Sequence, residues 1–182
     1  MTAAFFCLRA LVNGGFQLGA ATLLVTCLMP GALAGPRVPE IALNDQFDRL
    51  HRHREPFSRP LVVVIADRRG ASQIEGWVSE LYDRHGQSVD IVGVADLQGV
   101  PDFMKNALRK AFRKQCTTHP ILLDWNGDTT EAFDRGGSGL DVYAVDPGGD
   151  IVASASGAVS RAKLTRLSEA LEKPAGAFPV TR

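Results

Sequence analysis

The segment Asp-Arg-Arg-Gly-Ala-Ser at residues 67–72 is the first stretch whose residue types and position could support chemistry. It follows the apolar run 61–66 and precedes residues with helical spacing, so we interpret it as a strand-to-helix turn. Turns of this kind are where α/β proteins often place their ligand sites. Arg68 and Arg69 lie next to a helix N-terminus, whose backbone N–H groups favour anions, so they could bind an anion or a carboxylate. The alternative is a solvated surface loop.

Two other polar stretches are better interpreted as structural. Ser72 lacks the G-x-S-x-G elbow of a serine nucleophile, and its spacing to Glu75 is that of a capping box, so we expect it to cap the next helix. The segment DWNGDTTE (124–131) looks like a calcium loop at first sight. It lacks the twelve-residue spacing with a late Glu, and we interpret it as a turn.

Cys116 is the alternative catalytic candidate. Arg113, Lys114 and His119 are close to it in sequence and could favour its thiolate. Such a site would be a one-cysteine thiol peroxidase or reductase that needs an external thiol. The competing interpretation is a partly buried structural cysteine.

His51 and His53 would face the same side of a strand, which makes a metal carrier a third and weaker hypothesis. His85 and His119 could join them only from afar, and a tetrahedral site needs three or four ligands. We therefore expect no metal site and no cofactor.

Basic residues follow one stripe of a predicted helix, with Lys105, Arg109 and Arg113 at i, i+4 and i+8 and Lys110 and Lys114 beside them. Such a face could make peripheral contact with an anionic surface, either a lipid or an acidic partner. An ordinary solvated helix face is the alternative.

The elements that must position these residues alternate along the chain. We expect strands at 41–43, 61–66, 89–96 and 119–124, a hairpin within 141–156, and helices after 72, from 101 and from 160. The polar segment 44–60 ends in two prolines that disfavour a helix. This order predicts an α/β sandwich, with a central mixed β-sheet flanked by helices and closed by a C-terminal β-hairpin and a helix.

The N-terminal residues 1–34 have the pattern of a secretory signal peptide. Arg9 is their one charge, an apolar stretch follows, and the segment ends in Ala-Leu-Ala. We predict cleavage after Ala34, a periplasmic or secreted protein, and a single domain at 35–182. An uncleaved membrane anchor is the alternative, although the apolar run is short for a span.

Charge and cysteine content argue against two classes of protein, nucleic-acid binders and disulfide-stabilised domains. The chain has 20 Lys and Arg against 20 Asp and Glu, and this neutral balance argues against a nucleic-acid binder. Cys7 and Cys27 lie in the predicted signal peptide. The remaining Cys116 cannot form an internal disulfide, so the domain must be stabilised by its core.

Residues 38–173 resemble the thioredoxin-like superfamily, in its exported redoxin and peroxiredoxin-like branch. RPLVVVIAD (59–67) is similar to the strand that enters the active-site loop, and HPILLDWNGDTTEAF (119–133) to the inserted strand and its Asp-x-x-Gly turn. LDVYAVDPGGDIVASASGAVS (140–160) is similar to the terminal hairpin. Within the branch, the chain looks closest to small YtfJ-type periplasmic proteins.

The chain departs from this family at the redox site. Redox-active members carry Cys-x-x-Cys or a single peroxidatic cysteine in the loop that corresponds to 67–72, and this chain has no cysteine there. The family's cis-proline aligns with Leu140. A serine hydroxyl cannot replace a thiolate in disulfide exchange. The resemblance therefore implies a non-catalytic binding or accessory module for an unknown protein partner, with Arg68, Arg69 and Leu140 at its contact surface.

Overall fold

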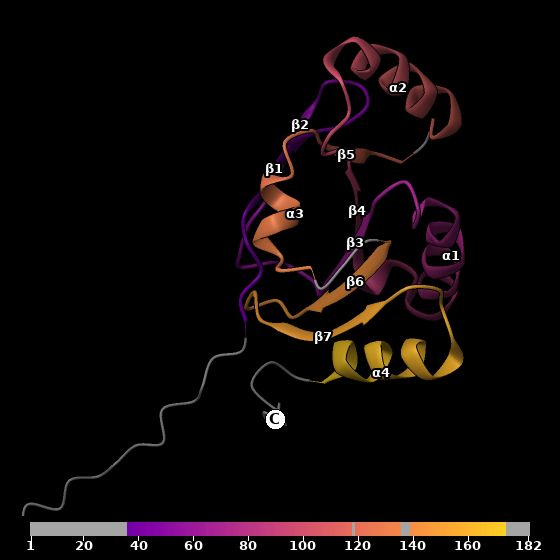
Figure 1. The fold of residues 1–182 in the computed structure, drawn as a ribbon. Coiled ribbons are helices and arrows are strands. Elements are labelled where there is room, and N and C mark those ends of the chain that lie inside the picture. Colours follow the sequence, from indigo (N-terminus) through magenta and orange to yellow (C-terminus); the bar gives the residue numbers. More distant parts are fainter. Residues whose placement is uncertain (1–35, 118, 136–138, 174–182) are drawn as a thin grey trace, which may run out of the picture. The chain divides into compact units, whose positions relative to one another are not determined.

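The apolar runs of the sequence form one five-stranded mixed sheet, shown in Figure 1. The computed structural model describes residues 36–117, 119–135 and 139–173. The strands lie in the order β5-β4-β3-β6-β7, where the first three are parallel and the last two are antiparallel to their neighbours. They are β3 (Leu61–Ala66), β4 (Asp90–Asp96), β5 (Ile121–Asp124), β6 (Leu140–Val145) and β7 (Ile151–Ser156). The mixed α/β sandwich predicted from the sequence is confirmed.

Helices and a hairpin cover the two faces of this sheet. Side chains of α1 (Ile74–His85) and α4 (Arg161–Glu172) share one buried cluster with Val62, Val64 and Ala66 of β3. The alternate β3 side chains Leu61, Val63 and Ile65 belong to a second cluster on the opposite face. That face is covered by α3 (Asp128–Ala132) and by the hairpin of β1 (Ile41–Asn44) and β2 (Leu50–His53). All six β3 residues are buried, as expected for a strand covered on both faces.

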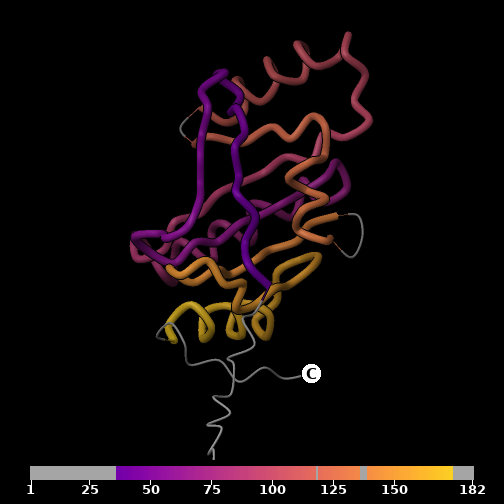
Figure 2. Tube along the Cα trace, turned by 90° about the vertical axis from the view of Figure 1, so that its left-hand side faces the viewer, coloured from indigo at the N-terminus to yellow at the C-terminus, as the bar shows by residue number. Residues whose placement is uncertain are grey.

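The strand β2 was not predicted from the sequence, because Leu-His-Arg-His shows no alternation of apolar and polar residues. Figure 2 shows the indigo hairpin running from the side of α4 to the side of α2 (Asp102–Gln115). Its turn is anchored by Gln46, whose side chain is fully buried. Gln46 Nε2 donates to the carbonyls of Cys116 (2.8 Å) and His119 (2.9 Å), and Gln46 Oε1 accepts from the Ile121 N–H (2.7 Å).

Helix α2 packs more loosely than its apolar stripe predicted. No residue of α2 is buried, and only Leu108 and Phe112 pack against the cluster around Leu97 and Leu123. Met104 is exposed, contrary to its expected place in the stripe. The helix contacts the sheet through one narrow side only, and its opposite side is exposed to solvent.

The predicted signal peptide, residues 1–34, lies outside the described residues, and its cleavage stays a prediction. Within the described part of the chain, none of the helices combines the length and the apolar character that a membrane crossing requires.

Candidate functional site

The turn after β3 is built by the side chain of Asp67. Its Oδ1 accepts the backbone N–H groups of Arg69 (2.7 Å) and Gly70 (3.0 Å). A short 3-10 helix, η1 (Ala71–Gln73), then leads into α1. This extra turn displaces Ser72 from the cap position, which Gln73 occupies without a side-chain cap hydrogen bond. The predicted capping role of Ser72 is therefore wrong, because the aspartate at the start of the turn organises the local N–H groups instead.

Asp67 also joins the turn to the start of β6. Its backbone N–H donates to the Gly139 carbonyl (3.0 Å), and the Gly139 N–H donates to Asp67 Oδ2 (3.0 Å). Gly70 lies against the same peptide: a Cβ at Gly70 would be 2.4 Å from the carbonyl carbon and oxygen of Gly139. The turn after β3 and the segment that leads into β6 thus meet through direct backbone contact.

The hydrogen bonds keep Asp67 ionised. Burial raises the pKa of this carboxyl, but the N–H groups of Gly70, Arg69 and Gly139 stabilise its charged form more strongly. The balance lowers its pKa below the ordinary value, and Arg135 adds to the effect. Asp67 is therefore a fixed acceptor and a poor candidate for a general acid or base at neutral pH.

Arg135 forms the second part of this site. Its guanidinium donates to Asp141 (2.7 Å), to Asp96 (3.0 Å) and to the Gly139 carbonyl (2.9 Å). The Arg135 side chain is only 5% exposed. Sequence reasoning missed this network, although aspartates at the ends of β3 and β4 were a usable signal, since the carboxyl ends of parallel strands meet at one sheet edge.

Around this network the predicted contact residues differ in accessibility. Arg68 and Arg69 are exposed on the turn. Leu140 does adjoin the turn, but its side chain is 1% exposed and belongs to the core beneath β6. Leu140 is therefore wrong as a contact side chain, because the sheet requires it as a core residue. The two arginines remain the candidates, and their binding role stays a prediction.

Cys116 lies apart from this site. It follows α2 and precedes β5, so it is at the edge of the sheet where the parallel strands begin. The Asp67 turn is at the opposite edge, where β3 ends. The thiol is partly buried and forms no disulfide. Cys116 is therefore not part of the site around Asp67.

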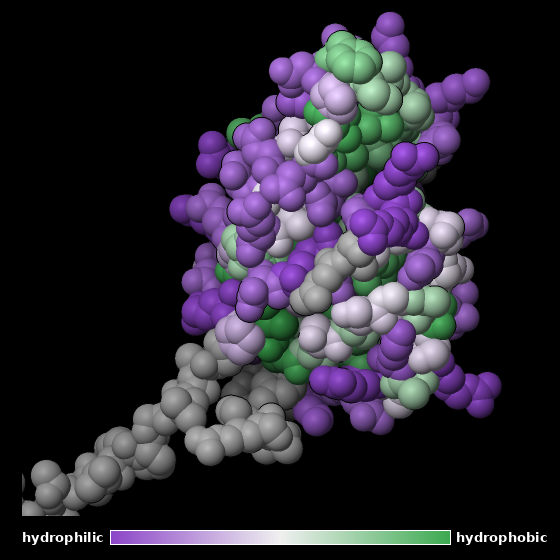
Figure 3. All heavy atoms as spheres, viewed as in Figure 1, coloured by the Kyte–Doolittle hydropathy of each residue, from purple (hydrophilic) through white to green (hydrophobic). Residues whose placement is uncertain are grey.

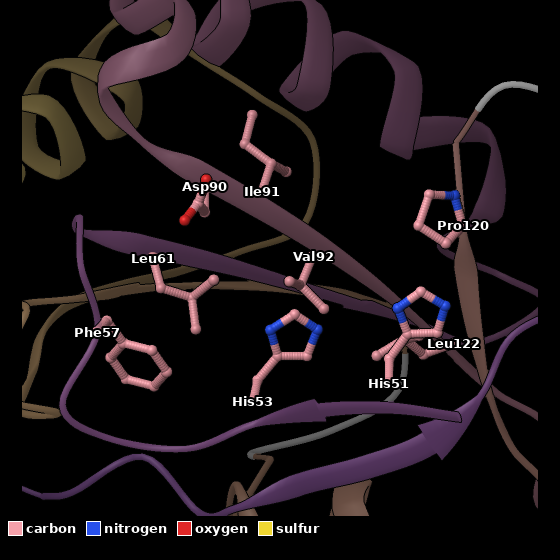
Figure 4. A pocket seen from close by; sticks show the side chains of 9 residues that line it. All are labelled: His51, His53, Phe57, Leu61, Asp90, Ile91, Val92, Pro120 and Leu122. Carbon is pink, nitrogen blue, oxygen red and sulfur yellow. The ribbon is translucent and has the colours of Figure 1, made fainter. Parts of the chain in front are cut away.

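His51 and His53 line a pocket of about 330 Å³ near the beginning of the parallel strands, shown in Figure 4. Both imidazoles point from β2 towards side chains of β4 and β5. His51 Nε2 is 2.9 Å from Asp45 Oδ2. Burial lowers the pKa of His53, and the neighbouring His51 lowers it further. Across the described residues, no three His, Cys, Asp or Glu side chains gather as a metal site would require.

Residues 124–127 form a turn, as predicted, but residues 128–131 of the same segment belong to the helix α3. Asp124 Oδ1 accepts the Gly127 N–H (3.0 Å), and Oδ2 accepts both the N–H (2.8 Å) and the hydroxyl (2.9 Å) of Thr130. The carboxylate is thus used in shaping the start of α3 and is not presented to an ion.

The basic stripe of α2 faces the protein's own residues. Lys105 Nζ and the Arg109 guanidinium each lie 5.6 Å from the centre of the Trp125 ring. Arg109 and Arg113 pair with Asp48 at 3.3 and 2.7 Å. These three cations are therefore engaged within the domain, whereas Lys110 and Lys114 beside them are exposed. Contact of this helix with an anionic surface stays a prediction.

Comparisons with solved structures identify the fold. A thiol:disulfide interchange protein of the thioredoxin family from Chlorobium tepidum TLS aligns with a TM-score of 0.55 and 16% identity, over 77% of this chain and 97% of that one. StoA from Bacillus subtilis aligns at 0.53 and 16%, over 75% and 99%. The exposed lipoprotein thioredoxin Etrx1 from Streptococcus pneumoniae strain TIGR4 aligns at 0.56 and 13%, over 72% and 99%.

These likenesses show that the chain has a thioredoxin-like fold, as its sequence predicted. The sequence matches no protein-family model and no curated protein. The closer resemblance to YtfJ-type proteins stays a prediction.

Proposed function

We propose that this chain is an exported thioredoxin-fold protein that binds an acidic segment of a partner protein through Arg68 and Arg69. The observation that carries the proposal is the closure of the former redox site by Asp67 and Gly139, which leaves two exposed guanidiniums on a fixed turn. Guanidinium groups match carboxylates through paired N–H donors. The fold then serves as a scaffold for recognition.

The electrostatics of the turn support an anionic ligand. Asp67 is the nearest carboxylate in sequence, but its oxygens already accept three backbone N–H groups. Asp96 and Asp141 are likewise held by Arg135. Arg68 forms no ion pair with the described part of the chain. The local acids are thus engaged, and the exposed guanidinium of Arg68 can bind an external carboxylate.

Export is the second part of the proposal. It rests on the predicted signal peptide at residues 1–34. The name of the pneumococcal structural neighbour describes an exposed lipoprotein, which is consistent with a fold used outside the cytoplasm.

The binding test uses a short polyglutamate peptide as the probe. Titrating it into the protein should shift the backbone amide resonances of Gly70 and Gly139, and the double variant Arg68→Gln/Arg69→Gln should abolish the shift. The matched control Arg161→Gln/Arg166→Gln removes the same charge from exposed positions of α4. Equal loss in the control would show non-specific attraction and would contradict the proposed site.

A turnover assay separates this proposal from the one-cysteine alternative. We expect neither peroxide nor a disulfide substrate to be turned over with a small-molecule thiol. Turnover that disappears in Cys116→Ser would instead make the chain a thiol-dependent oxidoreductase. Because Cys116 and the arginines lie at opposite sheet edges, the two assays report on separate sites.

A further inference from the structure

Helix α2 presents an unusual outer face. Phe103 is 83% exposed and Met104 is 48% exposed, and both lie in the first turn of the helix. Ala107 and Ala111 are exposed beside them. Figure 3 shows apolar side chains gathered over α2. A large aromatic side chain at such exposure gains nothing from the domain's own core, so it needs another explanation.

Helical geometry aligns this apolar end with two lysines. At 3.6 residues per turn, Phe103, Ala107, Lys110 and Lys114 fall within an arc of about 60° on the outer side. Met104 and Ala111 lie together on one side of this arc, about 80–100° from Phe103. The inner side holds Leu108 and Phe112, which pack on the sheet. The outer face is therefore an amphipathic surface of its own, apolar in its first half and cationic in its second.

The charged side chains on this face are lysines that can bind an external anion. Lys110 and Lys114 are exposed and form no ion pair with the described residues. The helix has one acidic residue, Asp102, and Lys105 binds it at 2.7 Å. The remaining cations, Arg109 and Arg113, are turned towards Asp48. The outer face thus carries unpaired positive charge with no carboxylate of its own helix to offset it.

We propose that this outer face of α2 (Phe103, Met104, Ala107, Lys110, Ala111 and Lys114) docks on an anionic phospholipid surface. Phe103 and Met104 enter the headgroup boundary, and the two lysines bind the lipid phosphates. Basic amphipathic helices with an exposed aromatic residue bind interfaces in this manner. The cationic half of the face favours a lipid surface over a second copy of this chain, whose α2 would bring like charges together.

The test uses the full chain with a local reporter, Phe103→Trp. Its emission should shift to the blue with vesicles containing anionic phosphatidylglycerol, and should stay unchanged with purely phosphatidylcholine vesicles. The natural Trp77 is buried and Trp125 is partly buried, so the new residue dominates the change. Tyr82→Trp on α1, also at an exposed aromatic position, is the control and should not shift.

Charge variants complete the test. Lys110→Gln/Lys114→Gln should weaken binding to anionic vesicles by roughly 30-fold, at about a factor of five per lysine. Arg161→Gln/Arg166→Gln on α4 and Arg68→Gln/Arg69→Gln on the turn should leave it nearly unchanged. A shift that is equal on both vesicle types, no shift, or a shift that grows with protein concentration without vesicles would each overturn the proposal, the last in favour of self-association.

Discussion

Asp67 and Gly139 are joined by two hydrogen bonds of 3.0 Å each, one between their backbones and one from the Gly139 N–H to the Asp67 carboxylate. In redox-active proteins of this fold, the corresponding segments are expected to hold cysteines and a cis-proline. Here a carboxylate uses that space to tie the end of β3 to the start of β6. The pair makes the turn part of the sheet's hydrogen-bonded structure, and Arg68 and Arg69 lie exposed on it.

Replacing the carboxylate should expose its contribution to stability. In Asp67→Asn the amide NH₂ would face the Gly139 N–H, so one acceptor is lost. We expect the free energy of unfolding to fall by about 1–3 kcal/mol at neutral pH. The pKa of Asp67 is lowered in the folded state, so its stabilisation is present above the unfolded value and is lost as the pH falls through the folded value.

Urea unfolding of wild type and Asp67→Asn between neutral pH and pH 3 measures this contribution. The difference between the two proteins should be largest near neutral pH and should shrink in acid. A difference that is constant across this range would contradict the assigned role of the ionised carboxylate.

Gly70→Ala tests the close approach of the turn to β6. The added Cβ would lie 2.4 Å from two backbone atoms of Gly139, and neither can rotate away as a side chain would. We expect a loss of about 1–3 kcal/mol through forced backbone displacement. Gly93→Ala in β4 is the matched control, because a Cβ there meets nothing within 4 Å. Thermal unfolding in which both variants behave alike would show that the turn is free to move.

The fold could be predicted from the sequence wherever burial dictates the residue pattern. The run 61–66 is apolar throughout because β3 is covered on both faces. The strand β2 could not be predicted, since Leu-His-Arg-His is stabilised by pairing with β1 and by the anchoring of the hairpin turn through Gln46. Met104 was misplaced because helical spacing identifies an apolar stripe and cannot say whether the sheet reaches all of it.

The position of the candidate site could be predicted from the sequence, but most of its side-chain contacts could not. The strand-to-helix turn and its two arginines follow from local sequence. The partners of Arg135 lie 39 and 6 residues away, at Asp96 and Asp141, and only the sheet topology brings them together. Leu140 was chosen by alignment to a cis-proline, and alignment gives a backbone position without the direction of its side chain.

Gln46 should be required for the attachment of the β1–β2 hairpin. Gln46→Ala leaves the carbonyls of Cys116 and His119 and the Ile121 N–H without their side-chain partner. Buried polar groups that lose a partner cost about 1–3 kcal/mol each, so the hairpin should detach before the main sheet unfolds. Hydrogen exchange of the β1 and β2 amides measures this, with the exposed Gln87→Ala as control. Unchanged protection in Gln46→Ala would assign the attachment to apolar packing alone.

Arg135 should be the most sensitive residue of the site. Arg135→Met keeps the length of the side chain but leaves Asp96 and Asp141 as neighbouring, largely buried carboxylates without a cation. Breaking a buried ion pair on one side costs about 3–5 kcal/mol, mainly through the uncompensated charge. Arg166→Met, at an exposed position of α4, should cost less than about 0.5 kcal/mol.

The triple variant Arg135→Met/Asp96→Asn/Asp141→Asn separates charge from packing. If the loss in Arg135→Met comes from the two unpaired carboxylates, neutralising them should recover a large part of it, measured by urea unfolding at neutral pH. A triple variant no more stable than the single one would instead assign the role of Arg135 to its hydrogen bond with the Gly139 carbonyl, which also holds the Asp67 turn in place.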